Sequence, residues 1–405
     1  MSMIQSADEL AAFCERLKQE EFVAVDTEFL RDKTYWPLLC LIQVAARGEA
    51  RAIDPLAPGM DLAPFVALLA DRGLLKVFHA ARQDIEIFFH LTGAIPAPLF
   101  DSQVAAMVCG FGDAVSYETL AGKLAGARID KSHRFTDWSA RPLTEKQLAY
   151  ALADVIHLRT IYEKLAQRLQ RTARAGWVDE EMAVLTNPDT YRLDPEFAWQ
   201  RLKPRSGSPR FLAVLRELAA WRESEAQRKN LPRNRILRDE ALLEVAAQLP
   251  RSPAEMARSR SLSRGIVEGP IGEAVLAAVG RGLEVAAHDA PTLPDRPEIP
   301  PGRGPLVELL KVLLKAKCES HHVAQKLVAN VADLELIAAY DQADVLALHG
   351  WRREVFGEDA LALKQGRIAL AAERDQIRIV RLDQGAEPGT EAAADSAAVK
   401  EKRTA

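Results

Sequence analysis

The most constraining feature of this sequence is a change of pattern near residue 194. Before it, short runs rich in β-branched and aromatic residues alternate with segments of helical periodicity; after it, strand-like runs almost disappear. The predicted strands are 21–29, 39–45, 51–54 and 74–78, and the predicted helices are 80–91 and 144–171. Strands that alternate with helices indicate an α/β layer architecture, so we expect an α/β domain followed by helical domains.

The helical part divides at a proline-rich stretch. Six prolines between residues 286 and 305 cannot continue a helix and predict a linker. A second helical block should run to about Ala372, and Gln376 to Leu382 alternates like an edge strand. Almost no large apolar residue follows, which predicts disorder. The expected division is a first domain at 1–200, helical domains at 208–285 and 303–382, a linker at 286–302 and a disordered tail at 383–405.

Composition excludes several classes of protein. Four scattered cysteines without a CxxC pair argue against a disulfide framework or a zinc site, so any metal should be held by oxygen. The sequence shows neither a signal-peptide pattern nor an apolar stretch long enough to span a bilayer, which predicts a cytoplasmic protein. The formal net charge of −4 gives no whole-chain sign of nucleic-acid binding.

Two carboxylates stand at the end of the first predicted strand. Asp26 and Glu28 are separated by one residue. Side chains at i and i+2 of a strand project from the same face, so both carboxylates should point to one spot. Taken alone, such a pair is more typical of a solvated strand end than of a catalytic site.

Two further acids lie in predicted helices. Asp84 is in the first turns after the fourth strand, where a carboxylate is also a common helix-start residue. Tyr150 and Asp154 are four residues apart in the long helix that Thr144 and Gln147 should cap, so the phenol and the carboxylate share a face. The surrounding helix is apolar. A carboxylate facing inward from it needs a partner or a metal, because burying an unpaired charge is costly.

Taken together, the four acids suit a metal site. Mg²⁺ prefers carboxylate and water oxygens, and two such ions about 4 Å apart can activate a water and stabilise the leaving 3′ oxygen of a phosphodiester. We predict that the site holds two Mg²⁺ ions, with Mn²⁺ as the alternative. The ordinary pKa of tyrosine, about 10, favours water orientation over proton abstraction for Tyr150. The predicted ligands and catalytic residues are Asp26, Glu28, Asp84 and Asp154, with Tyr150 as a further catalytic residue.

These residues, in this order, resemble the DEDD superfamily of 3′→5′ exonucleases. The motifs are Asp26-Thr27-Glu28, His79 to Asp84, and Tyr150-x-x-x-Asp154. The tyrosine is similar to that of the tyrosine subclass, since Ala149 stands where the histidine subclass has its histidine. Segments 100–103 and 130–143 look like those of the ribonuclease D family, although Ala80 replaces the usual Asn of the second motif. The resemblance implies a ribonuclease H-like domain, a mixed sheet flanked by helices.

The resemblance continues into the helical part. Segment 228–238 is similar to the signature of the helicase-and-ribonuclease-D C-terminal (HRDC) domain, and 350–357 looks like a second copy. It therefore implies two all-α HRDC-like domains after the exonuclease domain. It also implies a monomeric exoribonuclease that trims single-stranded RNA 3′ ends, notably those of tRNA precursors, and releases 5′-mononucleotides.

Substrate contacts are predicted in two places. Between Lys203 and Glu240, ten Lys or Arg face five Asp or Glu, an excess that suits phosphate neutralisation. In the loop before the long helix, Phe135 or Trp138 could stack on a base, although we expect Trp138 to plug the loop onto the sheet. The predicted nucleic-acid-binding residues are Thr27, His79, Gln83, Lys131, Arg228, Lys229, Arg233 and Arg235.

Two other functions remain open. A DNA exonuclease of the Werner type would use the same acids, but the doubled C-terminal domain without a GxxxxGK[ST] phosphate loop argues against it. A non-catalytic RNA-binding scaffold is the second alternative. The intact acids and tyrosine argue against that one.

Overall fold

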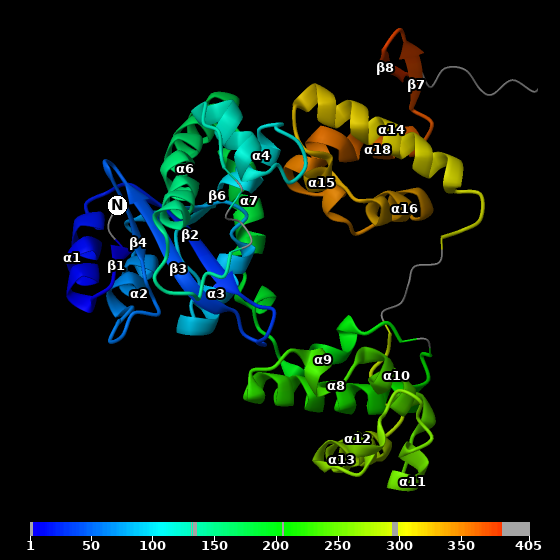
Figure 1. Cartoon of the computed structure of the whole chain (residues 1–405). Coiled ribbons are helices and arrows are strands. Elements are labelled where there is room, and N and C mark those ends of the chain that lie inside the picture. Colours follow the sequence, from blue (N-terminus) through cyan, green and yellow to red (C-terminus); the bar gives the residue numbers. More distant parts are fainter. Residues whose placement is uncertain (1–2, 131, 133–135, 205, 294–298, 383–405) are drawn as a thin grey trace, which may run out of the picture. The chain divides into compact units, whose positions relative to one another are not determined.

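The computed structural model describes residues 3–130, 132, 136–204, 206–293 and 299–382. The chain forms two compact units (Figure 1). The first contains residues 1–106 and 114–296, and the second contains 107–113 and 297–405. The predicted disordered tail, as well as Lys131 and Phe135, lies outside the described residues.

A six-stranded mixed sheet forms the centre of the first unit. Its strand order is β1-β4-β3-β2-β5-β6. Strands β2, β5 and β6 are parallel, whereas β3 is antiparallel to both β2 and β4. The bounds are β1 Met3–Ile4, β2 Phe22–Leu30, β3 Leu38–Ala46, β4 Glu49–Ile53, β5 Leu75–Phe78 and β6 Leu99–Asp101. Four of these strands were predicted within one or two residues, and the mixed α/β architecture is confirmed.

Helices cover both faces of this sheet. The long helix α6 packs on one face through a core that includes Ala24, Leu41 and Val155. Phe65 of α2 and Phe88 of α3 meet at 5.9 Å between ring centroids in another part of the core. The bounds are α1 Ala7–Leu17, α2 Ala63–Ala70, α3 Arg82–Thr92, α4 Ser102–Val108, α5 Tyr117–Leu120, a π-helical turn η1 Ala121–Ala125, α6 Glu145–Thr172 and α7 Ala175–Leu185.

Helix α6 begins where its sequence predicts. The Thr144 hydroxyl accepts from the Gln147 amide, and the Gln147 side chain accepts from the Thr144 amide. This reciprocal capping box satisfies two helix-start donors. Because the cap sets the first residue of α6, it also sets which side chains of this helix face the sheet.

The first helical region packs around α8 as one core. Ala198, Trp199 and Leu202 belong to this core, which thus begins before residue 208. A Cβ on Gly282 would lie 2.5 Å from the Val214 Cα, so α13 approaches α8 at a distance that only glycine permits. The bounds are η2 Pro188–Thr190, η3 Pro195–Arg201, α8 Pro209–Lys229, α9 Arg233–Ile236, α10 Asp239–Gln248, α11 Pro253–Met256, α12 Arg264–Val267 and α13 Pro270–Glu284.

A buried polar network joins α8 to the loop between β2 and β3. Glu223 is 1% exposed and accepts from the Tyr35 hydroxyl and, at 2.6 Å, from two nitrogens of Arg233. The Asn230 side-chain oxygen, at the left-handed C-cap of α8, accepts from the amides of Tyr35 and Trp36 at 3.1 and 2.9 Å. We call these five residues the clasp.

The second unit is helical but ends in a hairpin. Strand β7 pairs antiparallel with β8. The predicted helical block to Ala372 was therefore wrong at its end, whereas the strand predicted at Gln376 to Leu382 is confirmed as β8. The segment of β7 consists of Ala, Leu, Glu and Ile, and local composition alone does not separate it from a helix. The bounds are α14 Gly304–His321, α15 Gln325–Val328, α16 Val331–Ala339, η4 Leu346–Leu348, α17 Gly350–Arg352, η5 Arg353–Gly357, α18 Glu358–Lys364, β7 Ile368–Glu373 and β8 Gln376–Arg381.

The structure describes the cysteines and the longest apolar helices as follows. All four cysteines are buried and free, as expected for a chain without a disulfide framework. Among the described residues, no helix is both long and apolar enough to cross a membrane.

Candidate active site

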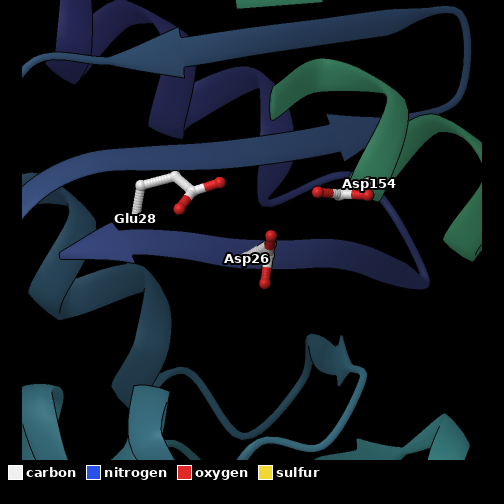
Figure 2. Close-up of side chains that lie close together, drawn as sticks. All are labelled: Asp26, Glu28 and Asp154. Carbon is white, nitrogen blue, oxygen red and sulfur yellow. The ribbon is translucent and has the colours of Figure 1, made fainter. Parts of the chain in front are cut away.

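Three carboxylates meet above strand β2. Asp26 and Glu28 come from β2 and Asp154 comes from α6, and one oxygen of each lies within 4.8 Å of the others. Figure 2 shows the three side chains converging in the space between the strand and the helix. A register shift in the β2–β3 pairing next to Glu28 marks a bulge, a device that re-aims side chains at strand ends. The predicted convergence of these residues is confirmed.

Asp84 reaches the same region from another element. It lies in the first turn of α3 and is 6% exposed. Its Oδ1 accepts from the hydroxyl of Thr27, a neighbour of Asp26 on β2, at 2.5 Å. Asp84 is also close enough to Asp26 and Glu28 to raise the pKa of both carboxyls. The Thr27 hydroxyl thus holds Asp84, the fourth acid, in place.

Burial raises the pKa of all four acids, and the charges of neighbouring site acids raise those of Asp26 and Glu28 further. Burial, followed by repulsion from Asp154 and Asp84, raises the pKa of Glu28 to about 8. Burial raises the pKa of Asp84 and of Asp154 to about 7. Burial, followed by the charge of Asp84, raises the pKa of Asp26 well above its ordinary value. Clustered carboxylates that resist ionisation together suit a cation, and an all-oxygen donor set fits Mg²⁺ or Mn²⁺.

A cavity of about 380 Å³ opens beside these carboxylates. Asp26, Tyr150 and Asp154 line it together with His79 and Tyr117. The Trp138 side chain is 2% exposed and lies in the core under α6, so it plugs the loop onto the sheet as predicted. Its ring stacks on that of Tyr150. Tyr150, the residue predicted to orient the water, therefore lines the cavity and packs on the buried ring of Trp138.

The comparisons with known proteins agree with this site. A family model described as a 3′-5′ exonuclease matches residues 1–170, and one described as an HRDC domain matches 211–279. The ribonuclease D of Granulibacter bethesdensis is 51% identical over 94% of this chain and 96% of its own. The ribonuclease D of Gluconacetobacter diazotrophicus is 52% identical over 93% and 96%. The chain belongs to the ribonuclease D family.

The fold of this ribonuclease D family member also matches a solved structure. The crystal structure of Escherichia coli RNase D, described as an exoribonuclease involved in structured RNA processing, superposes with a TM-score of 0.77 at 30% identity. The match covers 90% of this chain and 98% of that one. The chain is thus a ribonuclease H-like 3′-5′ exonuclease domain followed by helical regions that include an HRDC domain, and it is a 3′-5′ exoribonuclease by class.

Tyr117 is a cavity residue that sequence reasoning missed. Its hydroxyl donates to the Ala153 carbonyl at 2.9 Å, next to Asp154, and burial raises its pKa. Its ring meets the imidazole of His79 edge-on, at 5.5 Å between centroids. Ser116, which caps the short helix α5, was the one local signal that could have placed Tyr117 at a helix start.

The predicted RNA contacts near the acids occupy different positions. His79 lines the cavity, with Nδ1 at 2.9 Å from the Ser102 hydroxyl. Gln83 is exposed on the first turn of α3 and does not line that cavity. Lys131 lies outside the described residues.

The predicted basic contacts of the first helical region are largely paired with acids. Arg228 and Lys229 both bind Glu225 at 2.9 Å, and Arg233 belongs to the clasp. Arg235 is exposed and, in the part of the chain that the structure describes, has no carboxylate partner. It lines a cavity of about 770 Å³ together with Arg238, Arg260 and Asn234. Three carboxylates, Asp32, Asp239 and Glu240, line the same cavity, so its arginines stand beside acids as well.

Proposed function

We propose that this enzyme hydrolyses RNA from the 3′ end, one nucleotide at a time, and releases 5′-mononucleotides. The observation that carries the proposal is the group of three carboxylate oxygens within 4.8 Å at the side of a nucleotide-sized cavity. Water attacks the terminal phosphodiester phosphorus, the bond to the 3′ oxygen breaks, and that oxygen leaves with a proton.

We propose two divalent metal ions, Mg²⁺ before Mn²⁺, as cofactors. Asp26, Glu28, Asp84 and Asp154 would hold them. Oxygens of Asp26, Glu28 and Asp154 lie within 4.8 Å of one another, and the charge of Asp84 is close enough to raise the pKa of Asp26 and Glu28. When bound, the ions supply an activated water and charge neutralisation at the leaving oxygen. The rest of the site then binds and aligns the substrate.

Tyr150 and His79 are the proposed aligning groups of this chain. The Tyr150 phenol and Asp154 are one helical turn apart and line the same cavity, which suits the orientation of an attacking water. His79 lines the cavity with Nδ1 beside the Ser102 hydroxyl, and its ring is the proposed contact of the terminal ribose or phosphate. Gln83, Thr27 and Lys131 stay as predicted contacts of the RNA end.

The body of the substrate is proposed to lie on the first HRDC domain. Arg235, Arg238 and Arg260 offer guanidinium groups around one cavity, and such groups suit a phosphate backbone. Asp32, Asp239 and Glu240 also line this cavity, and Asp239 is paired with Arg222. Arg228, Lys229 and Arg233 stay predicted contacts. To bind a phosphate, they would have to release their present partners, Glu225 and Glu223. Structured precursors with short 3′ overhangs, tRNA among them, are the proposed natural substrates.

We also propose the remaining features of the molecular organisation. Residues 1–200 form the exonuclease domain, 208–285 the first HRDC domain and 303–382 a second, HRDC-like domain carrying the β7–β8 hairpin. The enzyme acts as a cytoplasmic monomer. A scattering mass in solution twice that of one chain would contradict the last point.

One assay tests the activity. Labelled single-stranded RNA and DNA of equal sequence are incubated with enzyme in Mg²⁺ or chelator, and the products are separated by length. We expect a ladder that shortens from the 3′ end of RNA, only with metal, and inhibition by a 3′-phosphate. Equal or faster degradation of DNA would favour the Werner-type alternative. Cleavage of circular RNA would exclude an exonuclease.

A further inference from the structure

Gln43 is a fully buried polar residue in the middle of the central sheet. It lies on β3 and its side chain is 0% exposed. In the antiparallel register it stands directly opposite Asp26 on β2, and on its other side it pairs with Ala52 of β4. Residues directly opposite each other project from the same face of a sheet, so Gln43 belongs to the face that carries Asp26 and Glu28.

Both polar atoms of the Gln43 carboxamide are without a hydrogen-bond partner. Within the described residues, neither Nε2 nor Oε1 has a partner, and both atoms are buried. The neighbours on this face include Leu41, Ala45 and Ala52, which form the apolar core under α6. A buried amide without partners is destabilising, and an apolar side chain would pack there without that penalty. Gln43 is therefore poorly explained as a packing residue.

The position of Gln43 indicates what could satisfy it. Cβ atoms of directly opposed residues in an antiparallel pair are about 5 Å apart, so the carboxamide starts beside the Asp26 carboxylate. Glu28 pairs with Leu41, two residues from Gln43, and is thus its diagonal neighbour. A site that binds Mg²⁺ gains ordered waters as well, because this ion keeps several of them. Such waters and the outer oxygens of Asp26 and Glu28 are polar groups that belong to the same face of the sheet as Gln43.

We propose that Gln43 is a positioning residue of the metal site, acting through Asp26 and the water held there. Once the site is loaded, its Nε2 donates to the Asp26 carboxylate and its Oε1 accepts from a site water. The inference rests on the proposed metal-dependent function, because it needs a loaded site. It assigns to an uncharged residue of β3 the task of fixing one ligand's orientation.

Metal binding by the full chain tests this proposal without any measurement of activity. The variant Gln43→Met keeps the length of the side chain and removes both polar atoms. Partners that orient metal ligands contribute roughly 10–100-fold to metal affinity, so we expect the Mg²⁺ Kd, measured by calorimetry without RNA, to rise by that factor. In chelator, the variant should melt at or above the wild-type temperature, because two unpaired buried groups are gone.

The matched control is Leu41→Met, two residues away on the same face of β3. It changes packing opposite Glu28 without touching a polar group, and should leave the Mg²⁺ Kd unchanged. If folded Gln43→Met binds Mg²⁺ with the wild-type Kd, the proposal is overturned. The Gln43 carboxamide would then do no more than bind a buried water. Should Gln43→Met fail to fold, Gln43→Asn withdraws the amide by one methylene, and a wild-type Kd in that variant is equally contrary.

The same titration separates this proposal from the proposed function. If the wild-type chain shows no Mg²⁺ or Mn²⁺ binding that Asp26→Asn abolishes, the metal assignment itself fails. If wild type binds metal and Asp26→Asn does not, only the comparison between Gln43→Met and Leu41→Met decides on Gln43. A weaker Kd for Gln43→Met with near-normal turnover at saturating Mg²⁺ is the pattern expected of positioning.

Discussion

The indole of Trp138 stacks on the phenol ring of Tyr150, with ring centroids 6.1 Å apart and planes inclined by 27°. Trp138 is buried in the core under α6, so the loop before that helix supports the group proposed to orient the attacking water. Trp138→Phe should keep the core filled but loosen this support. We expect the turnover number to fall several-fold, with little change in RNA affinity. An unchanged turnover number in single-turnover assays would separate Trp138 from the chemistry.

Removal of the Tyr150 hydroxyl should have a larger effect. Misplacing a reacting group by about 1 Å can lower a rate roughly 100-fold, and we expect a turnover loss of that order for Tyr150→Phe. RNA binding should be near normal, since the interaction is expressed in the transition state. Steady-state kinetics check this. A rise in KM alone would make Tyr150 a substrate contact instead.

Each of the four acids should be indispensable as a metal ligand. Asp26→Asn, Glu28→Gln, Asp84→Asn and Asp154→Asn should each nearly abolish hydrolysis while the fold survives. The same variants should melt slightly above wild type in chelator, because they relieve repulsion between buried carboxylates. Thermal melts and product ladders measure both effects. Half the wild-type rate at any two positions would contradict the two-metal assignment.

The raised carboxyl pKa values predict how the metal-free protein responds to pH. Unfolded, these carboxyls titrate near 4, whereas in the fold the pKa of Glu28 is about 8 and that of Asp154 about 7. Between these limits the native state binds more protons, so its stability falls as pH rises. Melting in chelator should thus drop by several degrees from about pH 5.5 to 8.5, and Mg²⁺ should reverse the loss at the alkaline end. A melting temperature that rises over this range in chelator would contradict the raised values.

Charge reversal at the arginine-lined cavity tests the proposed RNA surface. Arg235→Glu with Arg238→Glu should weaken RNA binding and flatten the dependence of log affinity on log salt by roughly 0.7 per lost contact. Equilibrium binding at several salt concentrations measures the slope. Arg264→Glu is the control of equal charge for each single reversal, Arg235→Glu or Arg238→Glu, since Arg264 is exposed and does not line this cavity. An unchanged salt slope in the double variant would show that RNA binds to another surface of the protein.

Local periodicity explains which parts of the site were predictable. Alternation along β2 put Asp26 and Glu28 on one face, and helical spacing did the same for Tyr150 and Asp154, so short-range patterns sufficed. Gln43 and Tyr117 could not be found in this way. Gln43 lies beside the site because β3 pairs with β2, and Tyr117 lies beside it because its segment contacts α6. These are contacts between distant segments that leave no local signal.

The same limit applied to the basic stretch of the first HRDC domain. Counting charges between Lys203 and Glu240 predicted a positive surface, but pairing with acids decides which charges are available. Arg233 illustrates the point, because its partners are Glu223 and the hydroxyl of Tyr35, a residue of the exonuclease domain. The hairpin partner β7 was missed for a related reason: strand pairing, rather than composition, defines it.

The clasp has a consequence for how such a chain can change over evolution. Glu223 is buried at 1% exposure and draws its hydrogen bonds from both the β2–β3 loop and α9. An HRDC domain taken from another protein need not have an acid at the position of Glu223. Tyr35 of the β2–β3 loop would then lose its buried hydrogen-bond partner. Leaving either buried group unpaired is costly, so domain shuffling at this seam requires matched substitutions on both sides. We therefore expect that replacing the first HRDC domain alone would destabilise the chain unless the clasp residues on both sides are kept.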